Sequence, residues 1–352
     1  MKKNKYIILI LFSIFIILFT KNNYFLYNSA ILEVTNVENT AIKDSEKIKQ
    51  NVKGIIKNGT QKGKVYTFSY ESSKSLVKDI RINKGIELFV DITSSKDISV
   101  IEVKRDVQIV MLIALVIDLI VIIAGKQGIK SMISTIINII LMISIILFHT
   151  KTNHKYNLLL IFIPITSILI VLTLFISNGN NKKTKTAIYA SIISVIISFI
   201  LSFLLLKIYE SNIYFYTMDF IEVAYDYQNI YYVIVLLSSL GAIMDISITM
   251  SSSFYEIIDK NPEISFDKLK KSGLRISSDI IGTMINVLML TTIITILPTV
   301  IFLFKNNMNI INAINVYGQT QIILILTSSI GIILSIPISM YTSLYIYKGR
   351  IK

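Results

Sequence analysis

Eight apolar stretches constrain the fold of this chain of 352 residues more than any other feature of its sequence. They cover residues 6–20, 107–124, 129–149, 158–176, 186–207, 230–251, 280–304 and 320–346. A helix needs about 20 apolar residues to cross the hydrocarbon of a bilayer, and every stretch but the first reaches the usable range. The sequence therefore predicts an all-α polytopic membrane protein of about eight transmembrane helices, with a membrane domain over 107–346.

The composition excludes several other classes of protein. Only 16% of the residues are charged and 53% are hydrophobic, whereas soluble domains carry about 25% charged residues. A soluble enzyme, a nucleic-acid-binding module and a disordered regulator are therefore excluded. The chain has no Cys and only two His, at positions 149 and 154, so the usual metal-ligand sets are missing. We expect no metal site, no cofactor and no enzymatic activity.

The first apolar stretch is short and follows the basic residues Lys2, Lys3 and Lys5, which is also typical of a cleaved signal peptide. Cleavage requires small residues after the apolar core, but this chain continues with Lys21 and two Asn residues. We therefore interpret residues 1–20 as a retained signal anchor that forms the first transmembrane helix.

The distribution of positive charge predicts the orientation in the membrane. If residues 1–5 lie inside, then most Lys and Arg residues between the spans also lie inside, as the positive-inside rule requires. Only four cations then fall in the short outer loops: Lys151, Lys155, Lys207 and Lys305. We expect both termini in the cytoplasm, together with loop 252–279 and tail 347–352, and residues 21–106 outside. The net charge of +13 is thus a topology signal, and we expect no nucleic-acid partner.

Residues 21–106 form the one sizeable soluble segment. Residues 38–49 read as a helix, and alternating patterns then predict strands near 64–70, 79–83, 85–92 and 98–103. Four glycines are expected in the turns between them: Gly54, Gly59, Gly63 and Gly85. We predict a small β-rich domain, a barrel or sandwich, that acts as a spacer or docks a protein partner.

Two carboxylates interrupt the apolar spans. An Asp at the centre of a transmembrane helix costs about 2.5–3.5 kcal/mol, and such residues usually face a cavity or a partner. Asp118 and Asp245 each lie six residues before the inner end of their span, about 9 Å from the boundary. We predict an ion or substrate site in the inner half of the bundle. Its candidate residues are Asp118, Asp245, Asn286, Thr283, Thr249 and Asn138.

Other polar residues in the spans have simpler explanations. Asn138 and Asn286 are equally well explained as hydrogen-bonding contacts between helices. Asp279 precedes an apolar run, which predicts a helix N-cap, and residues 263–272 predict a short amphipathic helix that Gly273 ends. Stripes of small residues predict helix-packing faces, namely Ser191, Ser194, Ser198 and Ser202, and Ser328, Gly331 and Ser335.

Three segments resemble the YibE/F family of multi-pass bacterial membrane proteins. They are GAIMDISITMSSSFYEI (241–257), SGLRISSDIIGTMINVLMLT (272–291) and SIGIILSIPIS (329–339). The positions that match the family are Gly241, Asp245, Ser252, Glu256, Gly273, Asp279, Gly282, Thr283, Asn286 and Pro337. The chain departs from the family pattern at Ser277 and Val287. The resemblance implies a location in the bacterial cytoplasmic membrane and no established reaction.

The favoured function is a secondary transporter or permease for an unknown small solute or ion. The Gly-x-x-x-Asp pattern at 241–245, with Glu256 eleven residues later, is also similar to resistance–nodulation–division permeases, which implies a proton relay at Asp245. The alternative is a scaffold, sensor or envelope-biogenesis factor that binds a protein partner through residues 21–106, or that forms a homo-oligomer. An intramembrane aspartyl protease is disfavoured, because Asp118 and Asp245 lack the Tyr-Asp and Gly-x-Gly-Asp signatures.

Overall fold

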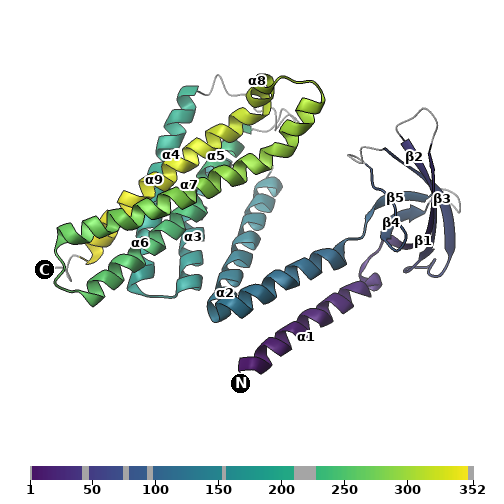
Figure 1. Cartoon of the computed structure of the whole chain (residues 1–352), viewed down its shortest axis with the longest axis horizontal. Helices are drawn as coiled ribbons and strands as arrows, with labels where there is room; N and C mark the ends of the chain where they lie inside the picture. The colour runs from purple at the N-terminus through teal and green to yellow at the C-terminus, as the bar shows by residue number, and fades with distance from the viewer. Residues whose placement is uncertain are drawn as a thin grey trace. The chain divides into compact units, whose positions relative to one another are not determined.

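A computed structural model describes residues 2–41, 47–73, 79–92, 98–152, 156–209 and 227–347 (Figure 1). The chain divides into two compact units, Met1–Gly128 and Ile129–Lys352. In the described part of the chain, six helices are long and apolar enough to cross a membrane, which confirms a polytopic helical membrane protein.

The first unit begins with helix α1 (Lys2–Lys21), which leads through a short 3-10 turn into a small β domain. Its five antiparallel strands form one sheet, a half-barrel, in the order β3-β2-β1-β4-β5. The strands are β1 (Ala30–Ala41), β2 (Lys47–Ile56), β3 (Val65–Ser73), β4 (Glu87–Ile92) and β5 (Ile98–Val103). The patterns near 64–70, 85–92 and 98–103 are thereby confirmed as strands, within a single open sheet.

Two expectations for the β domain were wrong. The described residues of 38–49 are strand, because β1 and β2 pair there, for example at Asn39 with Gln50. Pairing on a half-buried sheet outweighs the weak helix propensity of this polar stretch. Residues 79–83 form no strand, since the side chain of Gln50 exchanges two hydrogen bonds with the backbone of Ile82 in place of a ladder.

The glycines of the β domain serve two purposes. Gly59, Gly63 and Gly85 have φ angles of 70°, 86° and 85°, which favour glycine and confirm the predicted turns. Gly54 instead lies inside β2, where a Cβ would overlap the side chain of Leu32 on β1. Its role is to allow the two strands to approach closely, so the predicted turn there was wrong.

Helix α2 (Asp106–Lys151) contains two of the expected spans. Its helical backbone is broken at Gly125, where φ is 56° and ψ is −131°. Without that break, 46 residues would extend about 69 Å, more than twice the hydrocarbon thickness. Because α2 holds two of the expected spans and the apolar part of α1 is short (Ile7–Lys21), the structure shows six long helices where eight spans were expected.

The remaining helices belong to the second unit. They are α3 (Leu158–Asn178), α4 (Lys182–Tyr209), α5 (Tyr227–Ser238), α6 (Leu240–Lys260), α7 (Phe266–Lys305), α8 (Ile310–Ala313) and α9 (Gln319–Tyr347). The expected span 230–251 is divided between α5 and α6 at Ser239, whose φ and ψ are −96° and −5°. A π-helical segment, Ile314–Gly318, joins α8 to α9.

The segment 252–279, expected as a loop with one short helix, is largely helical. Helix α6 continues to Lys260 and α7 begins at Phe266, so Asp279 lies inside α7 and does not cap a helix. The predicted amphipathic helix is the first part of α7. Gly273 does not end it, because its missing side chain admits the ring of Phe254, which a Cβ would meet at 2.5 Å.

A seam of small hydroxyl residues packs α4, α6 and α9 together. Ser191, Ser194, Ser198 and Ser202 of α4 are buried, as are Ser328, Gly331 and Ser335 of α9, which confirms both predicted packing faces. Hydroxyl pairs join α9 to α5 at Ser328 with Ser238 (2.6 Å) and to α6 at Ser339 with Ser247 (3.0 Å). Small residues let helix backbones approach closely, which is how helices associate in hydrocarbon.

Replacing Gly331 with Leu tests this seam. A Cβ at Gly331 would lie 3.0 Å from Ser239 Oγ and 3.4 Å from Ser198 Cβ, so a larger side chain must push the helices apart. We expect a loss of about 1–3 kcal/mol in stability, seen as a lower thermal unfolding midpoint in detergent. The exposed neighbour Ile333 provides the control, as Ile333→Leu should leave the midpoint unchanged. An unchanged midpoint for Gly331→Leu would show that the seam is loosely packed.

Candidate functional site

Asp245 lies on the exposed face of α6. Gly241 and Thr249, one turn before and after it, are exposed with it, and Ser252 and Glu256 continue the predicted stripe. The residues between them, among them Ile243, Ile246 and Met250, point into the core. In the described part of the chain, the Asp245 carboxylate has neither a hydrogen bond nor an ion pair. The structure thus places an acid without a described partner on the exposed face of α6, five residues after the start of that helix.

The α7 candidates lie on a neighbouring helix. Thr283 and Asn286 are exposed, and Thr283 donates only to backbone carbonyls of its own helix, at 3.2 and 3.0 Å. Helices α6 and α7 run antiparallel, with Phe254 against Gly273 and Met250 against Ser277. Extended by the same spacing, this register sets Asp245 level with Gly282, and Asn286 lies about one turn, or 6 Å, further along. Among the described residues, no hydrogen bond joins Asp245 to Thr283 or Asn286.

Asn138 serves as a contact between helices. Its Nδ2 donates to the hydroxyl of Thr173 on α3 at 2.7 Å, while its Oδ1 is buried without a described partner. This is the interhelical contact that the sequence left open as an alternative. Asn138 makes no described contact with Asp245, so the structure does not join these two candidates in one site.

Asp118 has a partner on α1 that the sequence did not reveal. The hydroxyl of Ser13, itself buried, donates to Asp118 Oδ1 at 2.9 Å within the first unit. A serine inside an apolar helix was the available signal, but serines are common in these spans. The Asp118 carboxylate is therefore hydrogen-bonded and half-buried, whereas Asp245 belongs to the second unit and is exposed.

A buried charge cluster joins the β domain to both helices of the first unit. The ammonium group of Lys104 is fully buried and lies 3.2 Å from Glu87 on β4 and 2.9 Å from Asp106 at the start of α2. Asn23, just after α1, donates to Asp106 at 3.0 Å, and Tyr27 does so at 2.9 Å. The sequence analysis did not predict this cluster, although a Lys beside the start of a membrane helix was a visible signal.

Every charge in this cluster has a partner of opposite sign or a hydrogen bond. The hydroxyl of Tyr24 donates to Glu87, and the rings of Tyr24 and Tyr27 flank Lys104 at 5.4 and 5.7 Å. Burial acts to lower the pKa of Lys104, but the carboxylates of Asp106 and Glu87 outweigh it and raise that pKa above 10.5. Burial and the bond to Glu87 raise the pKa of Tyr24 well above 10.0.

The remaining family-matching positions have structural surroundings. Glu256 pairs with Lys183 of α4 at 2.9 Å, and that Lys lies 5.0 Å from the ring of Tyr255. Gly282 and Pro337 are exposed, and Asp279 is exposed on α7. These positions therefore fix a helix end or lie on a surface. Among the described residues, no group of three His, Asp or Glu residues could hold a metal ion.

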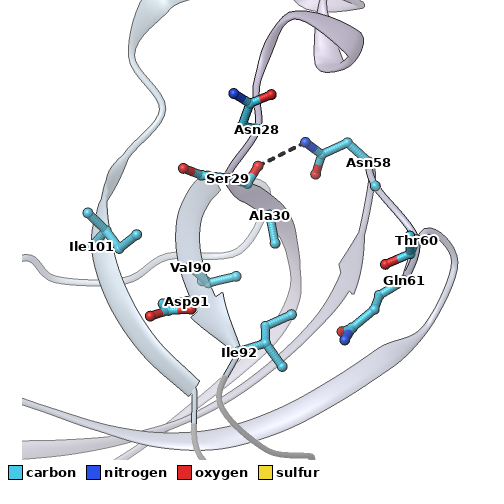
Figure 2. A pocket seen from close by; sticks show the side chains of 11 residues that line it. Asn28, Ser29, Ala30, Asn58, Thr60, Gln61, Val90, Asp91, Ile92 and Ile101 are labelled. Carbon is cyan, nitrogen blue, oxygen red and sulfur yellow. Dashed lines mark hydrogen bonds between the residues drawn. The ribbon is translucent and has the colours of Figure 1, made fainter.

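A polar cavity of about 590 Å³ opens in the half-barrel, between the start of β1, the β2–β3 turn and β4 and β5 (Figure 2). The buried side chain of Asn58 borders it but is fully used, since its Nδ2 donates to Ser29 O at 2.9 Å and its Oδ1 accepts from Ile31 N at 2.7 Å. Of the lining residues that the structure describes, only Asp91 is charged. The cavity suits a neutral or cationic polar group, but its lining offers no catalytic pair.

Comparison with known protein families gives two matches. The YibE/F-like protein model matches residues 112–349, and the YibE/F family N-terminal domain model matches residues 25–104. The two matches cover the membrane helices and the β domain. No curated protein and no solved structure matches the chain.

Replacing Lys104 with Met tests the buried cluster. The substitution leaves Glu87 and Asp106 without their cation, and removing one partner of a buried pair costs about 3–5 kcal/mol. We expect earlier thermal unfolding and faster proteolysis within residues 25–104 of the full-length protein. Lys53→Met, at an exposed position of the same sheet, should change neither. Equal protease resistance of both variants would show that the cluster contributes no stability.

The same cluster predicts how stability depends on pH. The pKa values of Lys104 and Tyr24 are higher in the folded chain than in the unfolded chain. Their contribution is therefore complete below about pH 10 and is lost as the pH rises through the folded-state values. We expect the unfolding midpoint of the β domain to hold between about pH 7 and 9 and to fall above pH 10. Lys104→Met should flatten that fall, and an identical slope would contradict this assignment.

Proposed function

Since the chain belongs to the YibE/F family and is a membrane protein, we propose that it is a secondary transporter that moves a proton or another cation, alone or with a small solute. In this proposal the chain crosses the bacterial cytoplasmic membrane eight times, with α1 and both arms of α2 counted as spans. Both termini lie in the cytoplasm, and residues 21–106 lie outside.

One observation carries the proposal, namely the unpaired carboxylate of Asp245. Its position on an apolar helix costs about 2.5–3.5 kcal/mol if it faces lipid, and no described residue offsets that cost. Gly241 and Thr249 lie on the same exposed stripe of α6, one turn before and one turn after Asp245. A carboxylate without a fixed counter-ion is free to take up a proton or a cation, which is the usual use of an intramembrane acid.

Asp118 is the second ionisable candidate of the transporter. Its described partner is the neutral hydroxyl of Ser13, so its charge is solvated by a hydrogen bond but is not neutralised by a cation. Loss of the Ser13 hydroxyl should therefore weaken, without abolishing, any transport step that needs ionised Asp118. Thr249, Thr283, Asn286 and Asn138 remain supporting candidates, and all four belong to the second unit with Asp245.

Ion flux into proteoliposomes tests this proposal. The full-length protein should dissipate an imposed gradient of H⁺, Na⁺ or K⁺, and Asp245→Asn should reduce the flux to the level of empty liposomes, because the amide cannot ionise. Asp259→Asn, at an exposed position of the same helix, is the matched control and should retain the flux. The proposal fails if the wild type moves none of the three ions, or if Asp245→Asn retains full flux.

The buried Lys104 cluster favours a second candidate function. It ties the β domain to the start of α2 and to the end of α1, so a ligand of that domain would act on two membrane helices at once. A sensor or envelope-biogenesis factor would use this connection, with a protein partner outside the cell. In that case Lys104→Met should abolish the cellular phenotype while Asp245→Asn preserves it. The transporter proposal expects Asp245→Asn to abolish it.

Single cysteines test the proposed orientation, because the chain has none of its own. Lys62→Cys lies in the β domain and Lys268→Cys near the start of α7, and both positions are exposed. A maleimide that cannot cross membranes should label Lys62→Cys in intact cells and Lys268→Cys only after permeabilisation. The reverse pattern would invert the topology.

A further inference from the structure

An apolar groove runs along α9 in the second unit. It has a volume of about 680 Å³, within the range of roughly 300–1,000 Å³ that is usual for small-molecule sites. Leu206 of α4 forms one wall, and Ile323, Leu326, Ile330 and Ile333 of α9 form the other. Helices α4 and α9 pack against each other along their length (Figure 1). Among the described residues that line the groove, none is charged.

The groove lies within membrane-spanning helices and opens at their surface. Both Lys182–Ile208 and Gln319–Tyr347 are apolar enough to cross a membrane. Leu326 is 58% exposed and Ile333 is 47% exposed, so the walls of the groove are apolar and uncovered. The medium in contact with such a surface is the hydrocarbon of the bilayer.

One end of the groove is polar. The π-helical segment before α9 contributes Asn315, whose exposed side chain has no hydrogen bond with any described residue. This end coincides with the end of α4 and the beginning of α9. The ends of spanning helices lie at the level of the lipid headgroups, so the amide of Asn315 is a free donor at that level.

The groove is long enough to hold a lipid chain across one leaflet of the bilayer. From Gln319 to Ile333 the groove follows α9 for about 21 Å. One leaflet of the hydrocarbon is about 15 Å thick, half of the bilayer core. The groove therefore extends from the headgroup level through one leaflet.

We propose that this groove is a specific lipid site, which binds one acyl chain of a membrane glycerolipid. The chain packs between Leu206 and the α9 residues, and Asn315 donates a hydrogen bond to an ester or phosphate oxygen of the same lipid. Lipid tails are as apolar as Leu, so selectivity comes from the shape of the groove and from this hydrogen bond. The lipid would thereby fix the spacing of α4 and α9, the two helices that carry most of the serine seam.

Photo-labelling tests the site. The full-length protein is reconstituted in phosphatidylglycerol vesicles that contain a phosphatidylglycerol with a diazirine on its acyl chain. After illumination, adducts are mapped by mass spectrometry. We expect them to concentrate on residues 319–333 and to exceed those on the exposed face of α7. Asn315→Leu should reduce groove labelling by about two- to tenfold, the change expected when one net hydrogen bond is lost.

A matched pair of variants separates a site from ordinary lipid contact. Leu326 and Leu290 are 58% and 59% exposed, but only Leu326 lines the groove. Leu326→Trp should fill the groove and remove its adducts, whereas Leu290→Trp should not. If Leu326→Trp lowers the thermal unfolding midpoint, Ile333→Trp replaces it. Even labelling of α7 and α9 would overturn the proposal. So would a wild type without adducts on 319–333 whose residues 210–226 cross-link to α9, because the chain itself would then occupy the groove.

Discussion

The structure of the second unit depends on one constraint, the need of its helices to pack closely in a medium without water. Helices in hydrocarbon gain little from hydrophobic contact with each other, so close packing and hydrogen bonds must hold them together. Here serine hydroxyls pair between helices, as at Ser247 and Ser339, and Gly331 lets the backbones meet. The core beside these serines is filled by larger apolar residues such as Ile246 and Phe254, and the ionisable Asp245 lies on the outer face of α6.

The sequence predicted the spans well and their ends poorly, for a physical reason. Hydrocarbon thickness requires a minimum apolar length, which is visible in the sequence, whereas a helix ends where its backbone finds other partners. Helix α6 therefore continues to Lys260, and α7 already begins at Phe266. Both helices extend well beyond the apolar residues. The strand pairing at residues 38–49 was missed likewise, because a pairing partner is not visible in a local pattern.

The residues of the candidate site divide in the same way, into those that a local sequence pattern reveals and those that only tertiary contacts reveal. Asp118 and Asp245 could be chosen as candidates because a carboxylate within a run of apolar residues is visible in the sequence itself. The bond of Ser13 to Asp118 and the bonds of Asn23 and Tyr27 to Asp106 could not, because they join residues far apart in the chain, 105 positions in the case of Ser13 and Asp118. The predicted partners of Asp245 were chosen by depth, and a shared depth fixes neither a contact nor the direction of a side chain.

The bond between Ser13 and Asp118 has a consequence for the order of assembly. Ribosomes add roughly 5–20 residues per second, so the 105 positions between these residues take about 5 to 20 s to synthesise. During that interval α1 is already made while its polar partners on α2 are not. The insertion machinery, or the surrounding lipid, must hold the first helix in place until Asp118 has been synthesised. The β domain has time to fold before Ser13 and Asp118 form their hydrogen bond.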